Sequence, residues 1–483
     1  MVNVFHSSAG AADVAGASDV AGPGAAGPAG PGTPAAPGAG ASIAMPGGAD
    51  AGPTAESEVV DLCRDLLRFD SVNQGNGDGH ERPIAEYVAA RLAEVGLEPI
   101  LLESAPGRTS VVTRVEGADP SRPPLLIHGH LDVVPADPSE WRVHPFSGEE
   151  VDGCLWGRGA VDMKDMDAMT LAVVRDMLRS GRRPPRDLVL AFVADEEAGG
   201  LLGARWLVEN HPDLFADCTE AISEVGGFSY TISDDLRLYL IETAEKGIAW
   251  MKLTVAGRSG HGSMINEDNA VTALCEAVAR LGRHRFPVVL TPTVRAFLEE
   301  LGDALGIEID TGDLRTTVAK LGPVAQMIGA TISNTVNPTQ LEAGHKVNVV
   351  PGEATAYVDG RFLPGQEEEF LRQIDELLGP RIRREWVVHD QAVETTFDGP
   401  LVDAMAAALR AEDPKARAVP YMLSGGTDAK SFSRLGIRCF GFAPLQLPSD
   451  LDFAGMFHGV DERVPVESLK FGVRVLDRFL RSV

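Results

Sequence analysis

The chain has 483 residues, of which 44% are hydrophobic and 23% charged, values that suit a globular protein with room for two domains. Its formal net charge of -27 argues against a nucleic-acid-binding protein and against docking on anionic lipid, because both need a basic face. It does not exclude an anionic substrate, since a local arginine can outweigh the overall charge.

The first 54 residues consist mainly of Ala, Gly and Pro and contain no Lys or Arg. They lack the positive start and the continuous apolar run of a secretory signal, so we expect a disordered tail or an artefact of an early start codon. No stretch reaches the roughly 18 apolar residues of a membrane span. We therefore expect no membrane partner. The five cysteines form no CxxC pair, which favours a reducing, cytoplasmic location.

From residue 58 onward, apolar periodicity predicts strands alternating with helices. The predicted helices run from residue 58 to near residue 69 and over 83–95, 166–180 and 203–210, and the predicted strands span 124–128, 187–194 and 220–223. This alternation favours an α/β fold with a mixed, mostly parallel sheet flanked by helices. We assign residues 55–245 to the first part of a catalytic domain.

The pattern changes between residues 246 and 362, where we predict an inserted α+β domain. It contains an alternating strand at 248–256, a helix at 270–281 and a hairpin at 346–362, whereas residues 287–323 show no readable pattern. Residues 363–483 return to the first pattern and form the second part of the catalytic domain. Helices are predicted there at 367–378, 400–410 and 466–480, with a strand at 437–442.

Residues suited to metal binding follow the predicted strands. His130 and Asp132 lie two apart on an extended segment, so they point to one side, and the carboxylate can orient a metal-binding imidazole. Asp162 follows Gly157 and Gly159 just before a helix, where it is either a helix cap or a metal ligand. Taken alone, each motif also fits a surface or capping role.

Three further acidic or imidazole groups occupy similar positions. Glu196 and Glu197 follow a buried strand, where one can bind metal while its neighbour acts as general base. Glu224 follows another strand, and His458 follows a glycine-containing loop. Oxygen and nitrogen ligands without cysteine suit Zn²⁺, with Co²⁺ or Mn²⁺ also possible, and one shared carboxylate would hold two divalent ions.

Together these segments resemble the co-catalytic metallopeptidase family of acetylornithine deacetylase, succinyl-diaminopimelate desuccinylase, aminoacylase, carboxypeptidase G and carboxypeptidase S. The matching segments, in the family's order, are HGHLDVVP, WGRGAVDMKD, ADEEAGG, SEVGG, GRSGHGS, DGRFLPG, SGGTDA and HGVDERV. The resemblance begins near residue 56 and continues to the end. Many relatives have Gly directly after the metal-binding Glu of the fourth segment, whereas Val225 stands there in this chain.

The resemblance implies a role for each matching residue. His130 and Glu224 would hold one metal ion, Glu197 and His458 the other, and Asp162 would bridge them. Asp132 would orient His130, and Glu196 would act as general base. In the inserted lid and dimerisation domain, His261 would stabilise the oxyanion, often across a homodimer. The remaining roles concern the substrate: Arg361 and Asn337 would grip its carboxylate, and Gly426 and Thr427 would line its pocket.

The sequence thus predicts a two-metal hydrolase that cleaves an amide or peptide bond of a small N-acyl-amino acid or peptide with a free carboxylate. A biosynthetic deacylase acting on a charged amino acid is the enzymatic alternative. A non-catalytic metal or peptide binder is the alternative from another class, but it would be expected to lack Glu196 or a metal ligand.

Overall fold

The computed structural model describes residues 52–307, 309–310, 312–314, 316 and 328–483. The predicted tail lies outside these residues except for its last three, of which Thr54 caps the first helix by accepting a hydrogen bond from the Ser57 amide. Within the described ranges, no helix combines the length and the apolar character needed to cross a membrane.

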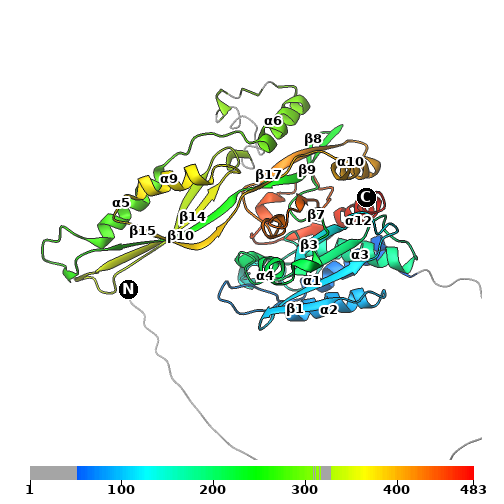
Figure 1. The fold of residues 1–483 in the computed structure, drawn as a ribbon, viewed down its shortest axis with the longest axis horizontal. Helices are drawn as coiled ribbons and strands as arrows, with labels where there is room; N and C mark the ends of the chain where they lie inside the picture. The colour runs from blue at the N-terminus through cyan, green and yellow to red at the C-terminus, as the bar shows by residue number, and fades with distance from the viewer. Residues whose placement is uncertain (1–51, 308, 311, 315, 317–327) are drawn as a thin grey trace, which may run out of the picture. The chain divides into compact units, whose positions relative to one another are not determined.

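A ten-stranded sheet, which we call the large sheet, forms the frame of the molecule (Figure 1). Its strands run in the order β1-β2-β6-β3-β7-β18-β9-β16, and β8 and β17 also pair with β9. The central strands β6, β3, β7 and β18 are mutually parallel, whereas β1 and β2 at the edge are antiparallel. This confirms the predicted mixed α/β fold. The strands are β1 (Ile100–Ala105), β2 (Arg108–Val115), β3 (Leu125–His130), β6 (Leu188–Val193), β7 (Glu220–Ser223), β8 (Phe228–Ser233), β9 (Leu236–Glu245), β16 (Val393–Glu394), β17 (Ala416–Leu423) and β18 (Arg438–Gly441).

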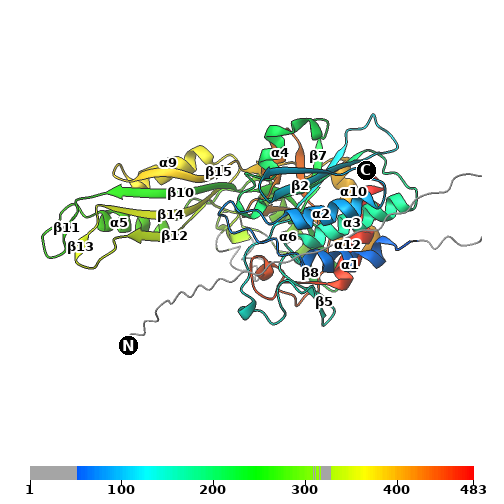
Figure 2. The same ribbon diagram turned by 90° about the horizontal axis from the view of Figure 1, so that it is seen from below.

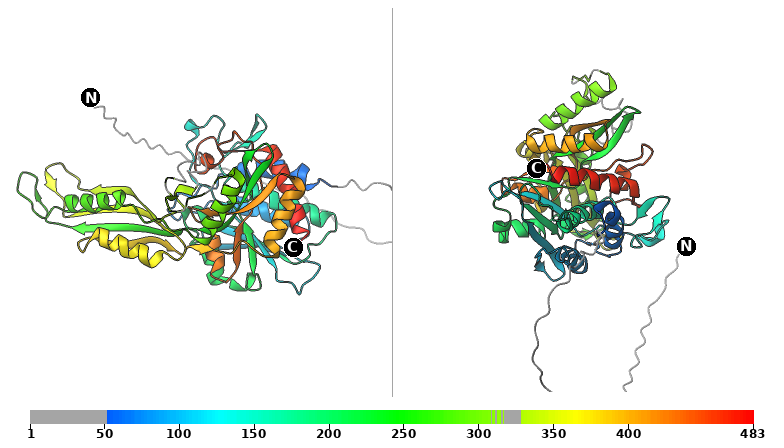
Figure 3. Two further views of the ribbon diagram at one scale, coloured as in Figure 1. Left: turned by 90° about the horizontal axis from the view of Figure 1, so that it is seen from above. Right: turned by 90° about the vertical axis from the view of Figure 1, so that its right-hand side faces the viewer.

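Helices cover the large sheet on both faces, so the central strands β3 and β6 are buried along their whole length. Leu125 and Ile127 of β3 pack on one face, and Leu126 between them packs on the other. The first face is covered by α1 (Ala55–Leu67), α2 (Arg82–Ala93), α3 (Lys164–Arg179), α10 (Pro400–Glu412) and α12 (Val466–Leu480). The opposite face is covered by α4 (Ala204–Asn210) and α11 (Ala429–Ser433). The last helix, α12, packs beside the first, α1 (Figure 3).

A second, antiparallel sheet of four strands, the small sheet, continues directly from the large one. Only Lys246 separates β9 from β10 (Gly247–Ala256), the first strand of the small sheet. The order is β12 (Thr335–Ala343), β14 (Glu353–Phe362), β10 and β15 (Arg383–Asp390). Helices α5 (Ala270–Arg283) and α9 (Glu367–Leu378) pack together against one face of this sheet (Figures 1 and 2).

Two sequence assignments differ from the structure around the small sheet. The predicted hairpin at 346–362 contains only one long strand, β14, whose hairpin partner is the earlier strand β12. Helix 367–378, which we placed in the second part of the catalytic domain, lies on the small sheet with β15. Its bounds were predicted well, but an amphipathic pattern specifies that one face is buried, and not which sheet buries it.

The segment 287–323, which has no readable pattern in the sequence, contains α6 (Pro292–Leu305). Thr291 caps this helix, and Phe297 and Leu301 pack on the core beneath β9 and β17 of the large sheet. This helix therefore belongs with the large sheet, although the sequence division placed it in the inserted domain. Part of the segment lies outside the described residues.

Candidate metal centre

The predicted metal-binding residues meet at one edge of the large sheet. His130 is the last residue of β3, Glu196 and Glu197 follow β6 after a short turn, and Glu224 follows β7. Because these three strands are parallel and adjacent, their carboxyl ends lie side by side. Loops from two other parts of the chain add Asp162 and His458.

Asp162 lies between the two histidines and contacts each with a different carboxylate oxygen. Its Oδ1 is 3.1 Å from His130 Nε2, and its Oδ2 is 3.3 Å from His458 Nε2. His130 Nε2 is also 3.6 Å from Glu224 Oε2, and His458 Nε2 is 3.1 Å from Glu197 Oε2. The five side chains therefore form two half-sites that share Asp162, and we call this group the cage.

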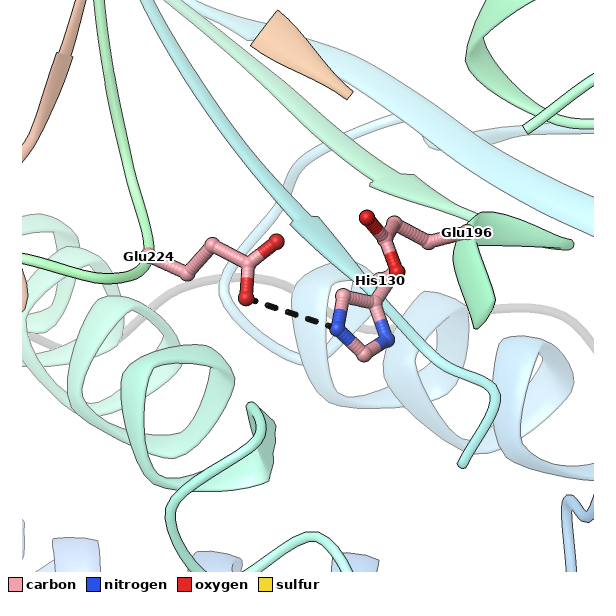
Figure 4. A group of neighbouring side chains, drawn as sticks. All are labelled: His130, Glu196 and Glu224. Atoms are coloured by element: carbon pink, nitrogen blue, oxygen red, sulfur yellow. Dashed lines mark ion pairs between the residues drawn. The ribbon is translucent and has the colours of Figure 1, made fainter. Parts of the chain in front are cut away.

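Glu196 stands at the edge of the cage without joining both half-sites. Figure 4 shows its carboxylate on one side of the His130 ring and the carboxylate of Glu224, which pairs with that ring, on the other. One ligand atom from each of these three residues lies within 4.8 Å of the others. Glu196 is therefore close enough to act on a group held by the cage.

Burial and crowding shape the charges of the cage. Burial disfavours the imidazolium form of His130, but Glu224 and Asp162 outweigh it and raise the pKa of His130 well above its ordinary value. Burial and the neighbouring Asp162 raise the pKa of Glu197 to about 7, and burial also raises the pKa of Glu224. Hydrogen bonds to Asp162 and Glu197 raise the pKa of His458 to about 10. Carboxylates crowded in this way repel one another unless cations lie among them.

The cage fits divalent cations. Glu197 Oε1 is buried and has no hydrogen-bond partner among the described residues. Because burying an unpaired polar atom is costly, this oxygen is available for a ligand. The donors are imidazole nitrogens and carboxylate oxygens only, the set that suits Zn²⁺, Co²⁺ or Mn²⁺. Each half-site supplies one histidine, one glutamate and a share of Asp162.

Asp132 supports the cage in a different way from the one predicted. Its carboxylate Oδ1 is 3.7 Å from His130 Nδ1, whereas its backbone carbonyl oxygen lies 2.9 Å from that nitrogen. The carboxylate instead accepts hydrogen bonds from the backbone amides of Glu196 and Glu197, both at 3.1 Å. It also accepts one from the Asn73 side chain at 2.8 Å. Asp132 therefore fixes the imidazole through its main chain and the Glu196–Glu197 turn through its side chain.

Glu462 holds the loop that carries Asp162, a role that sequence reasoning missed. It is fully buried and accepts hydrogen bonds from the backbone amides of Gly159, Val161 and Asp162. It also pairs with Arg158 at 2.8 Å. In the sequence, this glutamate sits in an acidic and basic run that indicates only the start of a helix. No local signal marks a residue whose partners lie about 300 positions earlier.

Backbone turns aim two of the cage residues. Val225, directly after Glu224, has φ +55°, and His458 has φ +57°, both in the left-handed region. Gly226 follows Val225 because a Cβ there would lie 2.1 Å from the Gly441 carbonyl oxygen. The turn after β7 is thereby pressed against β18, which directs Glu224 back toward His130.

The predicted residues of the inserted domain do not join the cage. His261 is exposed on β11 (Gly260–His261), where its Nδ1 lies 2.8 Å from Ser263 Oγ. Asn337 is exposed on β12. Arg361 on β14 pairs through two nitrogens with Asp359, at 2.7 and 3.1 Å, and lies over the Trp250 ring.

The pocket loop is placed at the cage. Gly426 and Thr427 line a cavity of about 770 Å³ that also contains Asp162, Glu196, Glu197, Glu224 and His458 in its wall. The Thr427 backbone amide and hydroxyl donate to the buried Glu245 carboxylate at 2.8 and 2.6 Å, which anchors this loop to the end of β9.

Comparisons with known proteins agree with this architecture. The pattern of peptidase family M20/M25/M40 matches residues 126–482. The chain is 27% identical over 454 residues to N-fatty-acyl-amino acid synthase/hydrolase PM20D1 of Xenopus tropicalis, covering 88% of this chain and 86% of that protein. It is also 27% identical over 448 residues to aminoacylase-1 of Pongo abelii, covering 89% and 97%. The crystal structure of an M20 family metallo-carboxypeptidase from Sulfolobus solfataricus matches the fold with a TM-score of 0.68 at 19% identity, covering 88% of this chain and 99% of that one.

The matched region covers most of the chain and contains the whole cage. The chain therefore belongs to peptidase family M20/M25/M40 and is a hydrolase that acts on amide or peptide bonds.

Proposed function

We propose that the protein hydrolyses the amide or peptide bond of an N-acyl-amino acid or short peptide that carries a free carboxylate. The observation that carries this proposal is Asp162, which contacts His130 and His458 with separate oxygens while Glu196 stands beside His130. The aminoacylase relatives favour this activity over a biosynthetic deacylase.

Two cations would be held by His130 with Glu224 and by His458 with Glu197, with Asp162 shared between them. Bound there, divalent ions activate water as a nucleophile and polarise the scissile carbonyl group. The Glu196 carboxylate accepts a proton from the attacking water and delivers it to the leaving nitrogen as the carbon–nitrogen bond breaks. Burial and the nearby Glu224 raise the pKa of Glu196 well above its ordinary value, which suits a group that exchanges protons near neutral pH.

Arg361 is the proposed partner of the substrate carboxylate. Its guanidinium already holds the Asp359 carboxylate through two nitrogens, which shows that it can bind a carboxylate bidentately where it stands. A substrate carboxylate would compete with Asp359 for that arginine. Asn337 lies opposite Asp359 in the strand register and would contribute an amide to the same contact.

His261 is proposed to act from a second copy of the chain. It lies beyond the far end of β10, a strand of ten residues that starts next to the large sheet. Such a strand spans about 33 Å at the usual rise per residue. This separation from its own cage supports a contribution of His261 to the cage of another copy, and hence a homodimer.

A cytoplasmic location remains a prediction, supported by five cysteines without disulfides.

A hydrolysis screen tests the proposed function. Purified full-length protein would be stripped with a chelator, reloaded with Zn²⁺, Co²⁺ or Mn²⁺, and assayed against N-acyl-amino acids and dipeptides. We expect turnover only after reloading, with two ions bound per chain by elemental analysis.

The same substrates with the carboxylate converted to an amide provide the control, and they should react more slowly. Turnover that survives complete removal of metal would contradict the proposed function, as would binding of a single ion with full activity.

A further inference from the structure

The cavity at the cage extends well beyond the reacting groups. Its volume is about 770 Å³, within the range of pockets that enclose a drug-sized molecule. A substrate as small as an N-acetyl-amino acid would leave most of this space to water. The part of the cavity beyond the cage therefore has room for a substrate group larger than acetyl.

Aromatic and aliphatic side chains form the walls of that part. Strand β8 contributes two residues on one face, strand β17 contributes one, and the loop before His458 contributes three more. We call this set the chamber: Phe228, Tyr230, Tyr421, Leu451, Phe453 and Phe457.

The chamber is held together by its own ring contacts. The ring of Phe228 lies 5.0 Å from that of Phe453 and 6.3 Å from that of Tyr421. Phe457 packs edge-on against Phe453 at 5.3 Å. Such contacts fix the walls before a ligand binds, so an apolar group can enter without first ordering them.

The charges of the cavity determine which end of a substrate the chamber accepts. Among the residues that the structure describes, its wall contains no lysine or arginine, and apart from the cage and Glu196 its acidic residues are Asp450 and Asp452, both exposed. A substrate carboxylate placed there would be desolvated without a cationic partner, which is costly. An amino-acid side chain that filled the chamber would hold the carboxylate, which is attached to the same carbon atom, at the entrance of the chamber. The acyl side of the amide carries no such charge.

We infer that the chamber receives the acyl group of the substrate, and that the enzyme prefers N-acyl-amino acids with long, uncharged, apolar acyl chains. This inference rests on the proposed function. Each methylene that moves from water into the chamber strengthens binding up to about fourfold, until the space is filled.

Acyl-chain length is the direct test. The metal-loaded enzyme would be assayed with N-acetyl-, N-hexanoyl-, N-decanoyl- and N-hexadecanoyl-alanine below their aggregation concentrations. We expect kcat/KM to rise steeply from the acetyl to the decanoyl compound. Equal kcat/KM values along the series, or a decline with length, would overturn the inference.

Substitutions then locate the preference. Leu451→Trp should fill the chamber and lower the decanoyl-to-acetyl ratio of kcat/KM about tenfold or more. Leu341→Trp, on the exposed strand β12, is the matched control and should leave the ratio unchanged. Tyr421→Phe keeps the ring and should also keep the ratio. Tyr421→Ala, which removes the ring, is the comparison. If Tyr421→Phe lowered the decanoyl-to-acetyl ratio of kcat/KM as much as Tyr421→Ala, the hydroxyl group would be the recognition element and the inference would be contradicted.

Binding separates this inference from the proposed function. Calorimetry on the metal-loaded Glu196→Gln variant measures affinity for the same series without turnover. Tighter binding of longer chains, with a negative heat-capacity change, supports the chamber even if no compound is hydrolysed, in which case only the proposed function fails. Binding independent of chain length would overturn the inference even if hydrolysis were observed.

Discussion

The large and small sheets carry their candidate site residues in opposite ways. At the carboxyl edge of the large sheet, five residues from distant parts of the chain form a compact group with contacts of 3.1 to 3.6 Å. On the small sheet, Asn337 is exposed and Arg361 is occupied by its neighbour Asp359, and His261 is exposed on β11, outside that sheet. The first set of residues lies together within a single chain, and the second set does not.

The difference follows from how each set is held. Parallel strands bring their carboxyl ends to one edge, so residues at the ends of β3, β6 and β7 meet whatever their separation in the sequence. The small sheet is antiparallel and begins where β10 continues from β9 of the large sheet. Its far end lies away from the cage. Under the proposed function, the candidate residues of the inserted domain would join a shared site only with a substrate or a second copy of the chain.

The largest expected effect concerns the large-sheet region. Glu196→Gln removes the carboxylate that we propose moves the proton but leaves every cage contact in place. We expect kcat to fall by about 10²–10⁴-fold while two metal ions remain bound. Activity assays with elemental analysis measure both quantities. Glu209→Gln, exposed on α4, is the control, and an active Glu196→Gln enzyme would show that another residue is the base.

The next effect tests whether His261 of a second copy completes the site. His261→Ala removes a group proposed to stabilise the oxyanion, so kcat should fall by about 10²–10³-fold with metal content unchanged.

Mixing His261→Ala with Glu196→Gln subunits should restore part of the activity, because a mixed dimer contains one site with both groups intact. Ultracentrifugation verifies that dimers form. If the mixture stays inactive although mixed dimers are present, His261 acts within its own chain, whereas full activity of the His261→Ala enzyme alone would show that this residue has no role.

A smaller effect concerns the support of the cage. Asp132→Asn keeps the size of the side chain but weakens its hydrogen bonds to the Glu196 and Glu197 amides. We expect metal affinity or activity to fall by about 10–100-fold. Metal titration against a competing chelator measures this change. An Asp187→Asn variant removes a carboxylate from an Arg114 pair away from the cage and should bind metal normally.

The smallest effect concerns the substrate carboxylate. Arg361→Lys keeps the positive charge but loses the two-pronged contact, so KM should rise about tenfold with little change in kcat. The control is Arg384→Lys on β15, which removes a similar pair between Arg384 and Asp375 of α9. Equal KM values for wild-type and Arg361→Lys enzymes would exclude this arginine from substrate binding.

Most elements could be predicted from the sequence, because their signals are local. Helices α9 and α12 and strand β7 match the predicted bounds, and the buried strands β3 and β6 differ by one or two residues at their ends. The missed strands include β9 and β17. Their sequences do not alternate clearly between apolar and polar residues, because other elements pack on both faces of these strands.

The candidate site divides along the same line. The side chains that are candidates for the chemistry could be predicted from the sequence, since a histidine or carboxylate after an apolar strand is visible there, and the eight segments occur in the family's order. How these side chains lie relative to one another follows from the tertiary structure. It placed Asp162 between the two histidines, gave Asp132 the Glu196–Glu197 turn to hold, and brought Glu462 to the Asp162 loop. The physical reason is that such contacts join segments up to about 300 residues apart, and no local pattern of residues records which distant backbone a buried carboxylate will meet.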